Sequence, residues 1–214
     1  MIQSHDRSGY FGASDTKRVV AKNRNTESFK KFWNEKLGGP PTFFANKHTI
    51  AGTKYEHSII RAVAEDMNWD RQIILDTPRM LLRVNYDGND EHNIYEIKTH
   101  ASDKVFEITE EYWMQAQVEM YAWKYAHEHG RTDSEFVPVE KLDSFQIVSY
   151  ALNAEELNTA DLIDDDDAYA GRLDIDHSRL KFHPVKYDKS WIKGEYLPAL
   201  KELTKALRKG KYPY

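Results

Sequence analysis

The chain has 214 residues, of which 40% are hydrophobic and 30% charged, as is typical of one globular domain with a substantial core. It contains no cysteine, which excludes disulfides and thiolate zinc sites, and no apolar run is long enough to cross a membrane. The formal net charge of −5 argues against a protein that coats DNA nonspecifically, although it leaves room for an enzyme with a locally basic DNA channel.

The first segment, Ser4 to Asp15, reads S-H-D-R-S-G-Y-F-G-A-S-D, and its two glycines predict a loop. Ser14 or Asp15 is a suitable N-cap for a helix that extends to about Lys22. Free N–H groups at a helix start bind phosphate, and Arg7 would add a planar charged group beside them. An ordinary capped helix with a surface arginine explains these residues equally well.

Two helices are expected next. The first, Glu27 to Leu37, has Thr26 as its N-cap and ends at a Gly-Gly-Pro sequence. The second, from about Gly52 to Met67, carries apolar residues at helical spacing, and Glu56 lies on or beside this stripe. A carboxylate there is costly unless it is paired, hydrogen-bonded or bound to metal. The alternative is a glutamate at the edge of the stripe that reaches water.

A β-hairpin is expected in the middle of the chain. The apolar runs Met80 to Val84 and Ile94 to Ile97 flank a turn-forming D-G-N-D sequence that begins at Asp87, which predicts Asp87 near the hairpin tip. Side chains alternate along a strand, so Glu96 and Lys98 share a face. Two carboxylates can hold a divalent metal, and the lysine can orient or activate a water beside it. The alternative is a solvated hairpin with a cross-strand ion pair.

A long helix is expected from about Thr109, as N-cap, to His129. Its first half contains Gln115 and Gln117, whose residue types alone indicate no role, because glutamines on a helix surface are usually inert. The closely spaced histidines of the chain lack the H-E-x-x-H spacing of a metal site.

The remaining elements alternate between strands and helices, which predicts a single α/β domain with a central mixed β-sheet and helices on both faces. Four consecutive aspartates, Asp164 to Asp167, are expected to form a solvated acidic turn. The other expected elements are strands at Arg71 to Leu75, Arg79 to Tyr86, Asn93 to Thr99, Phe145 to Leu152 and Leu180 to Tyr187, and helices at Ala154 to Ala160 and Lys189 to Arg208, the last kinked at Pro198.

The spacing of these charged residues resembles a known signature. Asp87 followed by Glu96-Ile97-Lys98 is similar to the D-x(n)-E-x-K motif of the PD-(D/E)xK nuclease superfamily. Further sequence elements make the chain similar, over nearly its whole length, to one branch of this superfamily, the phage lambda exonuclease and the YqaJ-like alkaline exonucleases. They are Arg7 seven residues before Ser14, G-x-x-x-E from Gly52 to Glu56, and Q-x-Q at Gln115 and Gln117.

The resemblance implies a restriction-endonuclease-like core in one domain over residues 1–214 and Mg²⁺- or Mn²⁺-dependent hydrolysis of linear double-stranded DNA, 5′ to 3′ from a phosphorylated end. It also implies a role for each matching residue. Glu56, Asp87, Glu96 and the backbone carbonyl of Ile97 would hold one or two metal ions, Lys98 would orient or deprotonate the attacking water, Gln115 would hold that water or a phosphate oxygen, and Arg7 with Ser14 would receive the 5′-terminal phosphate.

Two alternatives to an exonuclease stay open. One is a structure-specific or sequence-specific endonuclease of the same superfamily, and the other is a catalytically inactive DNA-binding scaffold for recombination. Arg7 and Ser14 favour an enzyme that starts at DNA ends, and the complete catalytic set disfavours an inactive relative. The resemblance also implies phage-type recombination with a single-strand annealing protein as partner, and it is compatible with a trimeric ring around DNA. We expect a cytoplasmic protein with no membrane partner.

Overall fold

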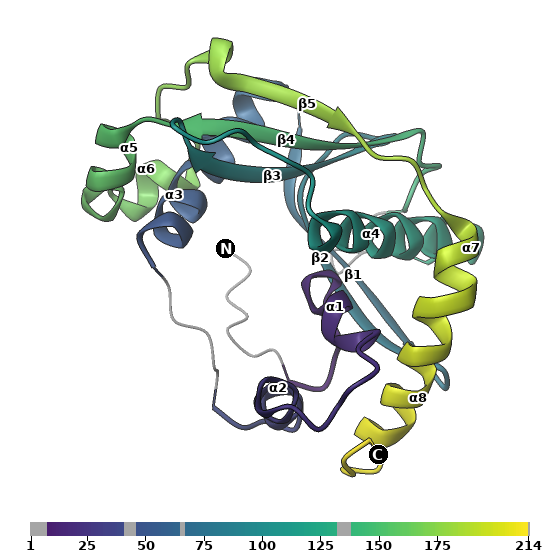
Figure 1. Cartoon of the computed structure of the whole chain (residues 1–214). Helices are drawn as coiled ribbons and strands as arrows, with labels where there is room; N and C mark the ends of the chain where they lie inside the picture. Colours follow the sequence, from purple (N-terminus) through teal and green to yellow (C-terminus); the bar gives the residue numbers. More distant parts are fainter. Residues whose placement is uncertain (1–7, 41–45, 65–66, 132–137, 214) are drawn as a thin grey trace.

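Five segments of the chain form one mixed β-sheet, in the order β1-β2-β3-β4-β5 (Figure 1). The computed structural model describes residues 8–40, 46–64, 67–131 and 138–213. The strands are β1 (Asn68–Thr77), β2 (Met80–Asn89), β3 (Asn93–Ala101), β4 (Ser144–Leu152) and β5 (Leu180–Pro184). β3 and β4 pair in parallel, whereas the other neighbours are antiparallel, so the mixed sheet is confirmed.

The long helices begin where the sequence supplies a capping side chain. Thr26 caps α2 (Glu27–Lys36) and Thr109 caps α4 (Glu110–Glu128), as predicted. α3 (Lys47–Val63) begins earlier than predicted because the Asn46 side chain accepts two N–H groups of its first turn. The other α-helices are α1 (Thr16–Val19), α5 (Ala154–Thr159), α6 (Asp165–Tyr169), α7 (Lys189–Trp191) and α8 (Leu197–Arg208).

Three predicted segments differ from the structure. The helix expected up to Lys22 is only a 3₁₀ turn, Ala13–Asp15, followed by the single turn of α1. The acidic turn is instead α6, because the Asp164 side chain caps it. The predicted kink of the last helix is a π-helical turn, Ile192–Tyr196, immediately before α8, where Pro198 cannot donate a helical hydrogen bond.

Helices cover both faces of the sheet, and each face has its own hydrophobic core. Ile147 and Val148 are neighbours on β4 and point to opposite faces. Ile147 packs in the core that includes residues of α2, α4 and α8, whereas Val148 packs with residues of α3. The predicted arrangement with helices on both faces is therefore confirmed.

The sheet opens between β2 and β3. These strands pair only near their hairpin turn, after which the β1–β2 ribbon turns away from β3 (Figure 1). Phe11 occupies part of the edge of β2 that is left open: its N–H donates to the Leu81 carbonyl and its carbonyl accepts the Arg83 N–H, both at 2.9 Å. The N-terminal segment is thereby attached to the sheet at the place where β2 and β3 separate.

A buried ion pair holds the turn that follows Phe11. The Asp15 and Lys36 side chains are 1% and 2% exposed, and their charged groups lie 2.6 Å apart. The Asp15 carboxylate also accepts the Gly12 N–H at 2.9 Å. This pair connects the C-terminal end of α2 to the 3₁₀ turn that carries Ser14.

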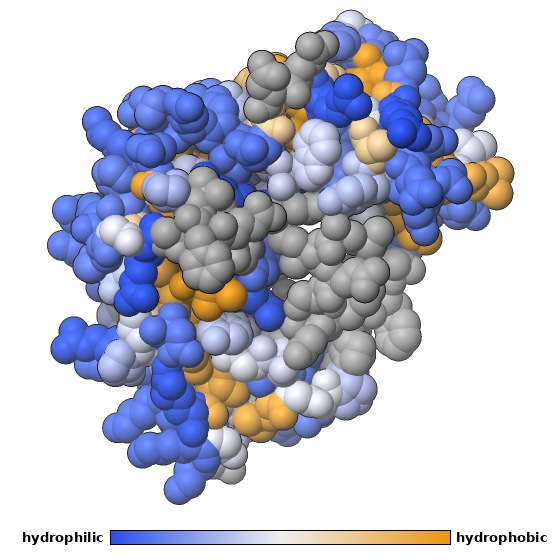
Figure 2. Space-filling model, turned by 180° about the vertical axis from the view of Figure 1, so that it is seen from behind, coloured by the Kyte–Doolittle hydropathy of each residue, from blue (hydrophilic) through white to orange (hydrophobic). Residues whose placement is uncertain are grey.

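The surface is mostly hydrophilic on the face seen in Figure 2, where apolar residues show as scattered patches. Such a face suits contact with water or with a charged partner. Within the described part of the chain, no helix combines the length and apolar character needed to span a membrane.

Lys36→Met should be strongly destabilising, because it leaves the Asp15 carboxylate buried and unpaired with lysine. Removing one partner of a buried pair costs about 3–5 kcal/mol, which urea unfolding would measure. The control is Lys30→Ala, since Lys30 pairs with Glu27 at the surface, where the side chains are 51% and 80% exposed. Equal, small effects of both substitutions would contradict a structural role for the buried pair.

Candidate active site

Asp87 lies where β2 and β3 separate. Its Oδ2 accepts the backbone N–H of Ile97 at 2.8 Å, so the carboxylate takes a hydrogen bond that a strand carbonyl would otherwise accept. Asp87 lies near the hairpin tip, as predicted, although it is a strand residue, because β2 continues two residues beyond it. The tip forms at Asp90, whose Oδ1 accepts the N–H groups of His92 and Asn93.

Glu96 is the point at which several side chains converge. It is 3% exposed, and its Oε1 accepts a hydrogen bond from Lys98 Nζ at 2.5 Å. Gln115 Nε2, from α4, donates to the same oxygen at 2.5 Å. The shared face of Glu96 and Lys98 is therefore confirmed, and the alternative of a solvated ion pair is excluded because the pair is buried between strand and helix.

Glu56 reaches the site because α3 packs very closely against β3. A Cβ on Gly52 would lie 3.2 Å from Thr99 Oγ1, so a larger residue would crowd the Thr99 side chain. One turn later, Glu56 is close enough for its negative charge to raise the pKa of Asp87. The glycine at the start of G-x-x-x-E therefore lies at the close contact between α3 and β3, one turn before the glutamate.

The structure also places Glu119 in the site, which the sequence reasoning missed. Glu119 lies one helical turn after Gln115 and is 1% exposed. Gln115 Nε2 donates to its Oε1 at 2.8 Å, in addition to its bond with Glu96. The signal that could have revealed it is the i,i+4 spacing from Gln115, which places both side chains on one face of the helix.

The two glutamines of the Q-x-Q sequence have different roles. Gln115 faces the carboxylates, as described above, whereas Gln117 is buried against the far end of the sheet. Gln117 Nε2 donates to the Lys186 carbonyl at 2.9 Å, and its Oε1 accepts the Asp188 N–H at 2.6 Å. Gln117 therefore joins α4 to the segment between β5 and α7, a structural function.

The electrostatics of the site are dominated by buried negative charge. Burial, then the charges of Glu96 and Glu56, raise the pKa of Asp87 well above its ordinary value. Burial and the charge of Glu96 do the same for the pKa of Glu119. Burial alone would lower the pKa of Lys98, but the adjacent carboxylates outweigh it and raise that pKa, so Lys98 is an ammonium ion.

This donor set fits a hard divalent cation. Carboxylate and carbonyl oxygens are the ligands that Mg²⁺ takes in proteins, and carboxylates that repel one another in a buried place are stabilised by a cation. Across the described residues, however, no group of three or more His, Asp or Glu side chains is already arranged around an ion position. Glu96 Oε1 instead accepts hydrogen bonds from Lys98 and Gln115. The proposed ligands Glu56, Asp87, Glu96 and the Ile97 carbonyl stay a prediction.

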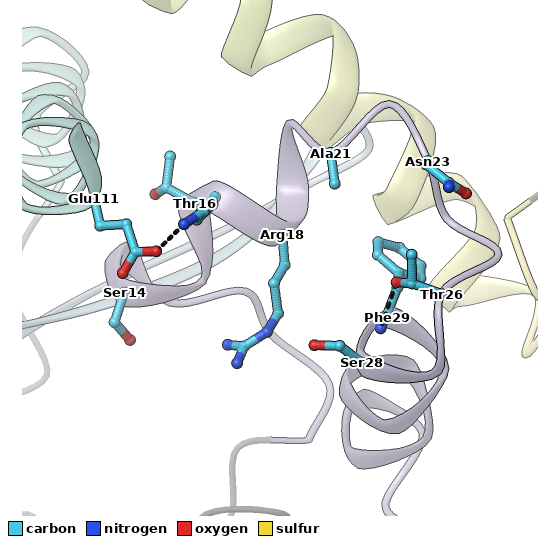
Figure 3. Close-up of a pocket in the computed structure, with 10 residues that line it drawn as sticks. Ser14, Thr16, Arg18, Ala21, Asn23, Thr26, Ser28, Phe29 and Glu111 are labelled. Atoms are coloured by element: carbon cyan, nitrogen blue, oxygen red, sulfur yellow. Dashed lines mark hydrogen bonds and ion pairs between the residues drawn. The ribbon is translucent and has the colours of Figure 1, made fainter.

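Of the residues predicted to bind the terminal phosphate, Arg7 lies outside the described residues. Ser14 is exposed and lines two adjoining hollows, one of about 190 Å³ shared with Gln115 and Glu119 and one of about 320 Å³ next to Arg18. Figure 3 shows Arg18 pointing from α1 into the space between α1 and α2, toward Ser28. The helix expected after Ser14 is only a 3₁₀ turn followed by the single turn of α1, and the phosphate-binding role of Arg7 and Ser14 stays a prediction.

Arg83 and Asn85 are further residues that the sequence reasoning did not identify. Both line the smaller hollow together with Ser14 and Gln115. They precede Asp87 at strand spacing, and this period of two is the signal that would have drawn attention to them. The Arg83 guanidinium also lies 5.6 Å from the centre of the Tyr10 ring.

No protein-family model matches the sequence, and no curated protein matches it significantly. Among solved structures, the chain is similar to a phage-related exonuclease from Haemophilus somnus 129PT, with a TM-score of 0.61, 15% identity, and coverage of 94% of this chain and 96% of the other. The chain has the fold of a phage-related exonuclease. It is also similar to LHK-Exo, solved in complex with dAMP, with a TM-score of 0.55, 20% identity, and coverage of 94% and 91%. The predicted resemblance is thereby confirmed for the fold.

Asp87→Asn tests whether Asp87 belongs to a cation site. The amide still accepts the Ile97 N–H but removes a repelled carboxylate, so the metal-free protein should melt about 2–4 °C higher, as for a gain of about 1 kcal/mol. Ca²⁺ should raise the melting temperature of the wild type and raise that of the variant much less. Asp103→Asn, at an exposed position outside the cluster, is the control. Equal Ca²⁺ responses of wild type and Asp87→Asn would exclude Asp87 as a ligand.

Proposed function

We propose that this chain is a Mg²⁺- or Mn²⁺-dependent exodeoxyribonuclease that degrades linear double-stranded DNA, 5′ to 3′, from a 5′-phosphorylated end. The observation that carries the proposal is the meeting of Lys98 and Gln115 on the buried Glu96 carboxylate, beside Asp87 and Glu56. These residues come from the hairpin and two separate helices. Their convergence on an exonuclease fold favours phosphodiester hydrolysis over a purely structural ion pair.

In the proposed mechanism, Glu56, Asp87, Glu96 and the Ile97 carbonyl hold one or two metal ions. A bound ion would polarise the scissile phosphate and lower the pKa of the attacking water. Lys98 is kept charged by its carboxylate neighbours, which favours orienting the water and stabilising negative charge over deprotonating it. Gln115 lines the adjoining hollow and assists there. Arg7 and Ser14 receive the terminal phosphate.

The competing functions predict different behaviour. An endonuclease of the same superfamily would need no DNA end, and an inactive scaffold would bind DNA without cutting it. We favour the exonuclease because Ser14 adjoins the hollow that Gln115 lines, so an end bound at Ser14 would lie beside the proposed catalytic residues. Phage-type recombination with a single-strand annealing protein, and assembly into a ring, are the setting that the resemblance implies.

The direct test follows the loss of linear duplex DNA over time with Mg²⁺. Activity should disappear in EDTA and fall strongly with Ca²⁺, and closed circular DNA should survive. Lys98→Ala should lower the rate by about 10²–10⁴-fold with little change in DNA binding, because the lysine acts on the reacting water. Lys104→Ala, an exposed lysine on the loop after β3, is the control. Full activity in EDTA, or a near-normal rate for Lys98→Ala, would contradict the proposed mechanism.

The proposed binding of the terminal phosphate by Arg7 and Ser14 predicts that the enzyme prefers 5′-phosphorylated DNA ends. A terminal phosphate carries more charge than an internal one, so linear DNA with a 5′-phosphate should be degraded faster than the same DNA with a 5′-hydroxyl. Arg7→Ala and Ser14→Ala should both reduce this ratio, whereas Lys98→Ala should slow both substrates alike. Paired time courses on the two DNAs measure it. Equal wild-type rates on both DNAs would contradict the role of Arg7 and Ser14 in binding the 5′-phosphate, but not the proposed metal site.

A further inference from the structure

We propose that Glu119 is a positioning residue that fixes the orientation of the Gln115 side-chain amide, so that Gln115 presents its carbonyl oxygen to the reacting centre. The inference rests on the proposed nuclease function and adds a residue to its machinery. The family resemblance implies no role for Glu119, and the inference is drawn from the hydrogen bonds around Gln115.

 

The hydrogen bonds around Gln115 use both of its donors. Its Nε2 donates one hydrogen to Glu96 Oε1 at 2.5 Å and the other to Glu119 Oε1 at 2.8 Å. A primary amide has only these two N–H groups, so none is left for a substrate oxygen. The group that remains available is Oε1 of Gln115, which can only accept a hydrogen bond. Gln115 and Glu119 both line the smaller hollow together with Ser14.

Glu119 makes this orientation of the amide the favoured one. If the amide were flipped, its carbonyl oxygen would face two carboxylate oxygens, and both N–H bonds would be lost. With Glu119 absent, a single bond to Glu96 would hold the amide, and the second N–H group would turn toward the hollow. Gln115 fixed in this way can accept a hydrogen bond from the attacking water but cannot donate to a phosphate oxygen. Of the two roles that the resemblance implies for Gln115, the geometry assigns the first, which is holding the attacking water.

A contribution to the stability of the fold does not explain the presence of the Glu119 side chain in the site. Its side chain is 1% exposed, and its Oε2 is buried without a hydrogen-bond partner among the described residues. A buried carboxylate with an unsatisfied oxygen lowers stability. The contact that anchors this part of α4 is separate from the carboxylate, because the Tyr86 hydroxyl donates to the Glu119 backbone carbonyl at 3.0 Å. Substitutions of the side chain therefore leave this anchor in place.

The test compares E119Q and E119A in the wild-type and Q115A backgrounds on linear DNA with Mg²⁺. E119A should lower kcat by about 10–100-fold, the effect of losing one hydrogen bond to a charged group, with KM nearly unchanged. E119Q should recover most of that rate, because its Oε1 can still accept the Gln115 N–H. In the Q115A background, E119A should add less than about a twofold loss, as expected for residues that act as one unit.

A second readout is independent of activity. Solvent exchange of the two Gln115 side-chain amide protons, followed by NMR, should be slow in the wild type and in E119Q and faster in E119A. The melting-temperature rise caused by Ca²⁺ should be kept in E119Q. If the wild type degraded no DNA, the proposed function would fail while the exchange measurement still tested the positioning.

Three results would overturn the inference. The first is unchanged exchange of the Gln115 amide protons in E119A. The second is an E119A loss of the same size with and without Gln115, which would mean that Glu119 acts independently. The third is an E119Q variant as slow as E119A that has also lost its response to Ca²⁺, which would make Glu119 a metal ligand instead.

Discussion

The candidate site depends on the buried carboxylate of Glu96. Its Oε1 accepts hydrogen bonds from Lys98 on the same strand and from Gln115 on α4, so one atom connects the sheet to the helix that covers it. Burying a carboxylate in this position costs desolvation free energy, and these charge-assisted hydrogen bonds offset part of that cost. The remaining negative charge, shared with Asp87, is what makes the place suitable for a cation.

Two features of the backbone bring the other residues to Glu96. The separation of β2 from β3 frees the Ile97 N–H for the Asp87 carboxylate, and it leaves an edge of β2 to which Phe11 attaches. Gly52 lets α3 approach β3 closely enough for Glu56 to act on Asp87. The fold thus brings together side chains from distant parts of the sequence.

Much of this arrangement follows from periodicity in the sequence. The period of two along β3 places Glu96 and Lys98 together, and the capping residues Thr26 and Thr109 locate two of the helices. Glu119 escaped the sequence reasoning because its i,i+4 spacing from Gln115 places the two side chains on one face of α4 but does not say which strand that face covers.

The misplaced elements have local physical causes. D-G-N-D supplies turn chemistry at several residues, but its first three residues belong to β2, because the Asp90 side chain accepts the N–H groups that form the turn. The helix after Ser14 is short because Asp15, its expected cap, pairs with Lys36 and accepts the Gly12 N–H instead. Tertiary contacts of this kind cannot be read from neighbouring residues alone.

The most direct test of the central claim is anomalous diffraction from crystals soaked in Mn²⁺. Mn²⁺ favours the same oxygen ligands as Mg²⁺ and can be located by its anomalous signal. The account predicts a peak bounded by the carboxylates of Glu56, Asp87 and Glu96 and the carbonyl of Ile97. The absence of a peak there, in crystals of a protein that degrades linear DNA, would contradict it.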